Sequence, residues 1–460
     1  MAQQSKITSR PLTKALGTAS ILSMAIAGAN VANALETDFG VEYEATAFAV
    51  ENEAENPGEY QSDTDDGFAH LIRLKGNFKH ESGVSLITSI ELAGDRWTGD
   101  GGRNTPVGSA NNGAYNTGNV GDNVRLDLGY VQIPLGGNIF RVGRQSASWN
   151  NCFLVCDDRR DRISGIFPTE IGTAVVLYDR RQDTSPLQNQ DDGDMVAAGL
   201  ITRAADMNIG LLWVHWLKDY EGGVASPVLD GADAAYVLDD VHLFSPYVSG
   251  NLGGVVDFAV GFNYVFNGGV EAQDTSTVNP ATGDFVYLNN DQYFTESNLS
   301  QYVRVGSSVG MAELDFQYVG SQDGGLISSG FDSYASVVNT NPESTASAAS
   351  LYRMGGGLGL KDFDEQLLIG RVGLNLTPQF KLQAAIGHLT VDDGNDDDSS
   401  MVYDLQAHYQ VNDAVKTSLT AGLLTNNDVG GLSGNSLSNV DGDWDENDAM
   451  AVTANLSIDF

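Results

Sequence analysis

The sequence predicts an all-β chain, folded as a single antiparallel transmembrane β-barrel of 16 to 18 strands, with 18 preferred. Segments in which apolar and polar residues alternate strictly recur along the chain from residue 39 to the last residue, which is the pattern of strands with one apolar face. Glycine is abundant at 53 residues and proline is rare at 11, which suits many strands separated by turns. Short and long connections alternate along the chain, so one rim of the barrel is expected to have short turns and the other rim long loops.

The first 34 residues have the features of a secretory signal peptide that is cleaved. Lys6, Arg10 and Lys14 give a positive start, residues 15–27 form a short apolar core, and the run 32–34 is a cleavage site of the A-x-A type. A buried N-terminal helix is the alternative. Residues 35–460 then form one barrel domain, with no internal repeat visible by eye.

The charge of the chain limits its partners. The chain carries 24 Lys and Arg against 61 Asp and Glu, a net charge of −37, and cleavage of three positive residues takes this to −40. Such a charge repels phosphates, which argues against nucleic acid as a partner, and it attracts cations. No apolar run of 18 residues follows residue 34, so the sequence predicts no transmembrane helix.

The strands predicted for the first half of the chain each place apolar residues at one parity. Phe39 and Val41, for example, share a parity that Glu42 does not. These predicted strands are Phe39–Ala49, Phe68–Phe78, Val84–Leu92, Val124–Ile133, Ile139–Gln145, Arg162–Phe167, Thr173–Arg181, Met195–Arg203 and Met207–Leu217. If the weak pair within 162–181 is misread, the barrel has 16 strands.

The second half shows the alternation most cleanly, as where Tyr403 and Leu405 oppose Asp404. Its predicted strands are Val241–Gly250, Val255–Phe266, Leu299–Ser307, Met311–Val319, Gln366–Leu376, Phe380–Val391, Met401–Val411, Val415–Leu424 and Ala449–Phe460. Charges such as Glu313 and Asp315 stand at mid-strand on the polar face, where the core of a soluble sandwich would exclude them. Strands that are polar inside and apolar outside match a closed barrel in lipid, with the short turns and both termini on the periplasmic side.

Three segments carry a resemblance to a known family. The segments LIRLKGNFKHESGVSLITSIELAGD, LDLGYVQIPLGGNIFRVGRQ and AVTANLSIDF resemble strands two to five and the terminal strand of Gram-negative outer-membrane porins of the general-porin type. The resemblance implies an outer-membrane homotrimer in contact with lipid and lipopolysaccharide. Leu456, Ile458 and Phe460 match the C-terminal signal that the barrel-assembly machinery reads in such proteins.

The resemblance also implies that the loop after the fifth strand, residues 146–161, folds into the barrel and narrows it. Acidic groups of this loop would face arginines of the wall, with Arg144 at the family's wall-arginine position. A solvated loop of mutually paired charges is the alternative. The candidate constriction residues are Arg73, Arg141, Arg144, Asp157, Asp158, Arg159, Arg160, Asp161 and Arg162.

Alternation and the resemblance disagree over Arg144. Because Phe140 and Val142 are apolar, alternation points Arg141 into the lumen and Arg144 outward. The resemblance implies that Arg144 faces the lumen. A bulge at Gly143 would reconcile the two expectations.

Cys152 and Cys156 are the two cysteines of the chain, and export to an oxidising compartment predicts a small-ring disulfide between them. A free pair or a metal site is the alternative, although no histidine lies nearby in the sequence.

Two acidic loops, 392–398 and 441–446, are candidates for weak binding of Ca²⁺ or Mg²⁺, for instance at Asp392, Asp393 and Asp396. Neither loop has the glycine that an EF-hand needs at its sixth position, so plain solvation is the alternative. We expect no other cofactor.

These features predict an outer-membrane channel for passive diffusion of small hydrophilic solutes and ions. Since selectivity follows the charge of the lumen, the charge of −40 predicts a preference for cations. A substrate-selective channel, whose arginine cluster binds anionic solutes or sugars, is the alternative, and a non-pore adhesin or structural barrel is a third. We expect no enzymatic activity, because no nucleophile is accompanied by a base and an acid at a recognisable spacing.

Overall fold

The computed structural model describes residues 35–52, 63–96, 124–182, 193–218, 241–266, 276–278, 285–287, 297–322, 325–328, 330–339, 354, 364–392, 397–425 and 448–460. The predicted signal peptide, the acidic loop 441–446 and the candidate metal ligands Asp393 and Asp396 lie outside these residues. Among the residues described, we find no helix that is both long and apolar enough to cross a membrane.

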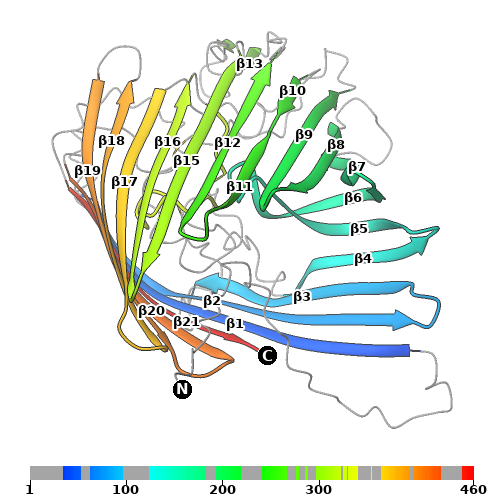
Figure 1. Cartoon of the computed structure of the whole chain (residues 1–460), viewed down its shortest axis with the longest axis horizontal. Helices are drawn as coiled ribbons and strands as arrows, with labels where there is room; N and C mark the ends of the chain where they lie inside the picture. Colours follow the sequence, from blue (N-terminus) through cyan, green and yellow to red (C-terminus); the bar gives the residue numbers. More distant parts are fainter. Residues whose placement is uncertain are drawn as a thin grey trace, which may run out of the picture.

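The strands follow one another around a closed antiparallel barrel (Figure 1). Within the described residues the barrel has 19 hydrogen-bonded segments, of which β10 and β11 are two parts of one strand, since both pair with β9 and β12. The predicted all-β barrel of 18 strands is therefore confirmed. A separate hairpin, β13 (Ser276–Val278) and β14 (Phe285–Tyr287), forms its own small sheet.

The barrel segments have the following bounds. In chain order they are β1 (Leu35–Asn52), β2 (Asp63–His80), β3 (Ser85–Arg96), β4 (Arg125–Leu135), β5 (Asn138–Trp149), β6 (Val155–Thr169), β7 (Gly172–Gln182), β8 (Gly193–Ala204), β9 (Met207–Lys218), β10 (Val241–Phe244), β11 (Tyr247–Leu252), β12 (Val256–Phe266), β15 (Asn298–Val309), β16 (Ala312–Gln322), β17 (Asp364–Asn375), β18 (Phe380–Asp392), β19 (Asp397–Gln410), β20 (Val415–Thr425) and β21 (Ala449–Asp459).

The first and last strands close the barrel. β1 pairs with β21 from Glu42 opposite Asp459 up to Asn52 opposite Ala449. Phe460 adds the final rung, because its carbonyl oxygen accepts a hydrogen bond from the Val41 amide at 2.6 Å and its own amide donates back at 3.0 Å. Closure leaves neither strand with an unpaired edge in this register.

Tight turns join the strands at one rim. Gly136 and Gly137 link β4 to β5 with φ of +60° and +85°, and Ala205 and Asp206 link β8 to β9 with φ of +48° and +65°. Positive φ at both central residues is the requirement of the two-residue hairpin turn whose twist matches that of the strands. The predicted alternation of short turns and longer loops is confirmed.

The outer face of the wall is apolar. Exposed large apolar side chains recur at alternate positions, such as Leu314 and Phe316 on β16 and Tyr403 and Leu405 on β19. Neighbouring strands share this face in register, as Val142 opposite Ile163 shows. An exposed apolar surface this extensive suits contact with hydrocarbon and not with water.

One strand of the wall is interrupted at Ser245 and Pro246, between β10 and β11. Proline has no amide hydrogen to give to the ladder. The backbone at the break is still paired, because the Ser245 amide donates to the Leu212 carbonyl at 2.8 Å and the Pro246 carbonyl accepts from the Phe262 amide at 3.2 Å.

Two of the described segments fold inside the barrel. The first is the connection between β5 and β6, which we call the tip (Asn150–Leu154). The second, which we call the inner segment (residues 325–328 and 330–339), follows β16 and contains deeply buried apolar side chains such as Phe331 and Val337. The predicted loop at 146–161 is therefore wrong for most of its length, since residues 155–161 belong to β6.

The outward apolar face predicts the effect of a charge placed on it. Leu405→Arg, at a position 58% exposed in the middle of β19, should lower the free energy of unfolding in lipid by about 2–4 kcal/mol, because the guanidinium must enter hydrocarbon. The measurement is urea unfolding in lipid vesicles. Thr420→Arg on the inner face of β20 is the matched control, and an equal loss in both variants would contradict the assigned orientation.

Candidate functional site

The tip crosses to the inner face of strands far from its own. The Asn150 side-chain amide donates to Ser245 Oγ at 3.2 Å and to the Phe262 carbonyl at 3.3 Å, while the Asn151 amide donates to the Tyr302 hydroxyl at 2.6 Å. The Trp149 indole donates to the Ser245 carbonyl at 2.9 Å, so the tip is anchored at the break between β10 and β11. Of the loop predicted to fold inward after the fifth strand, only the five residues of the tip do so.

The inner segment lines a broad part of the wall. At one end the Leu326 carbonyl accepts from Asn263 Nδ2 on β12 at 2.7 Å and from Ser300 Oγ on β15 at 2.6 Å. Further along, the Ser336 amide donates to the Asp404 carboxylate on β19 at 2.8 Å. These contacts hold the segment across the inner faces of β12 to β19.

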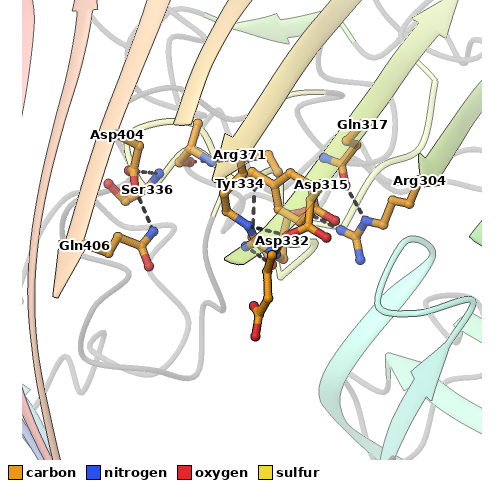
Figure 2. A network of polar contacts seen from close by, with 12 residues as sticks. Arg304, Asp315, Gln317, Asp332, Tyr334, Ser336, Arg371, Asp404 and Gln406 are labelled. Carbon is orange, nitrogen blue, oxygen red and sulfur yellow. Dashed lines mark hydrogen bonds and ion pairs between the residues drawn. The ribbon is translucent and has the colours of Figure 1, made fainter. Parts of the chain in front are cut away.

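Two arginines of the wall enclose Tyr334 of the inner segment (Figure 2). The Arg371 guanidinium lies 3.7 Å from the centre of the Tyr334 ring and that of Arg304 lies 5.2 Å from it. Arg371 donates to Asp315 on β16 at 3.0 Å and lies 3.6 Å from Asp332 of the inner segment. Cation–π contact and ion pairing therefore hold the segment at this place. Burial raises the pKa of the Tyr334 hydroxyl, which keeps it neutral.

A second group of charges covers the inner face of β1 to β6, and we call it the arginine–carboxylate network. Its centre is Arg73, whose side chain is only 5% exposed and lies 3.4 Å from Asp127, 3.7 Å from Glu91 and 3.8 Å from Glu42. Bulges in the β2–β3 and β3–β4 pairings bring these groups together. The remaining members are Arg125, 2.8 Å from Glu91, and Arg159, 2.5 Å from Asp127.

The other predicted constriction residues lie on strands and are paired with neighbours. Arg162 makes two hydrogen bonds to the buried Asp179 on β7, at 2.6 and 2.7 Å. Arg141 donates to Gln132 at 2.9 Å and lies over the Tyr130 ring. On β6 itself, Arg160 pairs with Asp158 and Arg159 pairs with Asp157. The predicted grouping of acids on a loop against arginines on the wall is wrong, because these acids and arginines share one strand.

Arg144 lies on the outward face. The β4–β5 and β5–β6 registers run without a shift through Gly143, although its φ is +124°. Arg144 is therefore on the face of Val142, opposite Asp161, and its guanidinium lies 3.4 Å from that carboxylate. Alternation predicted this orientation, and the lumen position implied by the family resemblance is wrong.

Several important residues could not be identified from the sequence. Asp127, Glu91 and Asp179 are the carboxylate partners of the wall arginines, and only the strand register brings them together. Asp332 and Tyr334 belong to the inner segment, which lies between the predicted strands Met311–Val319 and Gln366–Leu376. The one signal in the sequence was apolar residues within a stretch rich in serine and glycine, such as Leu326, Ile327 and Phe331.

The interior is lined by both apolar and charged side chains. Wherever the structure describes the chain, no three His, Cys, Asp or Glu side chains gather to hold a metal ion. Apolar clusters cover the inner face of β8 to β21 together with the tip and the inner segment, whereas the arginine–carboxylate network covers β1 to β6. The interior therefore combines an apolar region around the tip and the inner segment with charged groups of the wall, which include Asp315 and Arg371 as well as the arginine–carboxylate network.

No protein-family model matches the chain, and no curated protein matches it. A BenF-like porin from Pseudomonas fluorescens Pf-5 has a similar structure, with a TM-score of 0.53 and 12% identity over 92% of this chain and 99% of that chain. OccAB2 of Acinetobacter baumannii is similar with a TM-score of 0.51 and 10% identity, over 92% of this chain and 98% of that chain. These likenesses support a porin fold and do not extend to the general-porin type.

Two ion pairs that involve β6, Arg162–Asp179 and Arg144–Asp161, predict contrasting effects of substitution. Asp179→Ala should lower the free energy of unfolding by about 3–5 kcal/mol, because it leaves the Arg162 guanidinium, 12% exposed, without its carboxylate. Asp161→Ala, the matched control, should cost less than about 1 kcal/mol, since that pair is 36% and 63% exposed. Urea unfolding of the refolded protein measures both, and equal losses would contradict the burial argument.

Proposed function

We propose that the protein forms a channel in the outer membrane of a Gram-negative bacterium and that small hydrophilic solutes and ions cross it by passive diffusion, without enzymatic activity. The observation that carries this proposal is the barrel with an apolar exterior and a charged inner face on β1 to β6. Hydrocarbon accepts the first surface. Water and ions can reach the second through its outermost charges, since Glu42, Lys75 and Arg125 are 27%, 42% and 36% exposed. The likeness to porin structures supports the proposal at the level of the fold.

We place the passage between the inner segment and the charged wall of β1 to β6, since the tip and the inner segment pack against the inner faces of β12 to β19. Asp332 marks the inner segment's side of this passage, because its side chain is 62% exposed. The excess of 61 acidic over 24 basic residues supports a preference for cations.

A solute-selective channel is the second candidate. It requires guanidinium groups that recognise an anionic solute or a sugar, and Arg304 and Arg371 lie next to the exposed Asp332. The carboxylate partners of Arg73, Arg159 and Arg162 favour simple diffusion, because they neutralise much of the wall's positive charge. Concentration-dependent block of single-channel current by one solute class would favour the second candidate, and a silent barrel would favour an adhesin or structural role.

Charged side chains on the outer face of β5 to β8 support the proposed contacts with membrane lipid, lipopolysaccharide or another copy of the chain. Arg144 and Asp161, with Arg180 and Asp194 beside them, form a polar row on an otherwise apolar face. Such a row suits the headgroup level of the membrane, next to lipopolysaccharide, or contact with another copy in a trimer. Lipid, lipopolysaccharide, the homotrimer and recognition of Phe460 by the barrel-assembly machinery remain parts of this proposal.

Ion selectivity provides the direct test. Reversal potentials of the reconstituted channel in a KCl gradient should indicate cation preference, and Asp332→Asn should lower the ratio of K⁺ to Cl⁻ permeability about twofold. One unit charge about 8 Å from an ion in water contributes roughly 0.5 kcal/mol, which gives this factor.

Asp413→Asn is the matched control, because it removes the same charge from an exposed turn between β19 and β20. It should leave the reversal potential unchanged. A barrel that prefers anions, or equal shifts in the two variants, would contradict the proposed passage.

A further inference from the structure

The tip carries a covalent ring. The sulfur atoms of Cys152 and Cys156 are bonded and the two Cα atoms lie 4.4 Å apart, so the disulfide closes a ring of backbone that contains Phe153. Both cysteine residues are half-buried and not enclosed. We propose that this disulfide is a thiol-sensitive modification site, at which a small dithiol releases the tip and the inner segment and so widens the passage. The effect on the passage rests on the proposed function.

The backbone of the tip supports a role for the bond in holding its shape. Asn150, Asn151 and Cys152 have φ of +56°, +54° and +66°, three consecutive left-handed residues without a glycine. Asparagine enters this region more readily than most residues, whereas cysteine adopts it at a cost and keeps it where its surroundings impose it. The bond to Cys156 constrains the tip at the last of the three. Once it is broken, Cys152 is free to return to the ordinary region of φ.

Movement of the tip reaches the inner segment through Phe153. Its ring is fully buried, with its centre 4.7 Å from that of Tyr302 on β15 and 4.9 Å from that of Phe331 on the inner segment. Its carbonyl oxygen accepts a hydrogen bond from the Ser328 amide at 2.9 Å. Withdrawal of Phe153 therefore removes an apolar contact from Phe331 and a backbone partner from Ser328.

The inner segment also has contacts that do not depend on the tip. Ser336 bonds to Asp404, and Tyr334 packs against Arg371. The segment is thus expected to stay attached near 334–336 while its stretch beside Phe153 loosens. A partial release of this kind widens the passage and leaves the barrel wall intact.

The reduction is an ordinary thiol–disulfide exchange. A thiolate of the dithiol attacks one sulfur of the Cys152–Cys156 bond, forms a mixed disulfide and expels the other cysteine as a thiolate. The second thiol of the reagent, after losing its proton, attacks the mixed disulfide and releases the remaining cysteine thiolate. The protein disulfide gains two electrons, the dithiol becomes a cyclic disulfide, and each protein thiolate takes up a proton.

The test uses the full chain, refolded under oxidising conditions and then treated with dithiothreitol. Hydrogen exchange read by mass spectrometry should show a loss of amide protection around 326–331 that re-oxidation restores, while the strands of the wall keep theirs. Single-channel current in a planar bilayer should increase on reduction. The Cys152→Ser/Cys156→Ser variant should not respond to dithiothreitol, and Phe153→Ala should show the same loss of protection with its disulfide intact.

Two outcomes would overturn the inference. One is a disulfide that resists dithiothreitol in the folded barrel, seen as no gain of the mass of the two added hydrogen atoms. The other is complete reduction with unchanged exchange around 326–331. A barrel that never conducts would instead refute the proposed function, since hydrogen exchange still decides whether the disulfide controls the inner segment.

Discussion

Closure of the backbone ladder is the constraint on which the rest of this structure depends. Each strand of the wall pairs on both sides, and the rung between Val41 and Phe460 completes the circle. In hydrocarbon no water replaces a missing hydrogen-bond partner, so a closed ladder is the condition for an apolar exterior. Once the register is set, each residue is assigned to the inner or the outer face.

The inner charges follow from that register. Arg73 stands directly opposite Glu91, Arg162 opposite Asp179, and Asp315 opposite Arg371. Directly opposed residues on neighbouring strands are close enough to pair, so each of these guanidinium groups meets a carboxylate of the next strand. The wall thereby presents many charges to the interior with few buried ones left unbalanced.

The fold was readable from the sequence because the membrane environment imposes one rule on every strand. Alternation located β19 and its outward residues Tyr403 and Leu405, and it also gave the correct face for Arg144. It failed for residues 155–161, where charged residues occupy both parities and no apolar face is present. Both faces are polar there because the charged side chains of this stretch pair with Asp127 on β4 and with Arg144 on β5.

The packing inside the barrel was less predictable from the sequence, because no local pattern determines where a loop folds. The stretch around Leu326 and Phe331 is apolar enough to be buried, yet the sequence does not say that its partners are Phe153 and Tyr302. Those contacts depend on the strand break at Ser245 and Pro246, which receives the tip, and on the tip itself. A barrel wall of this width is specified by local alternation, whereas what fills it is specified by long-range packing. In the proposed passage, a few side chains on the tip and the inner segment would set the width, and these can change without disturbing the ladder that holds the barrel closed.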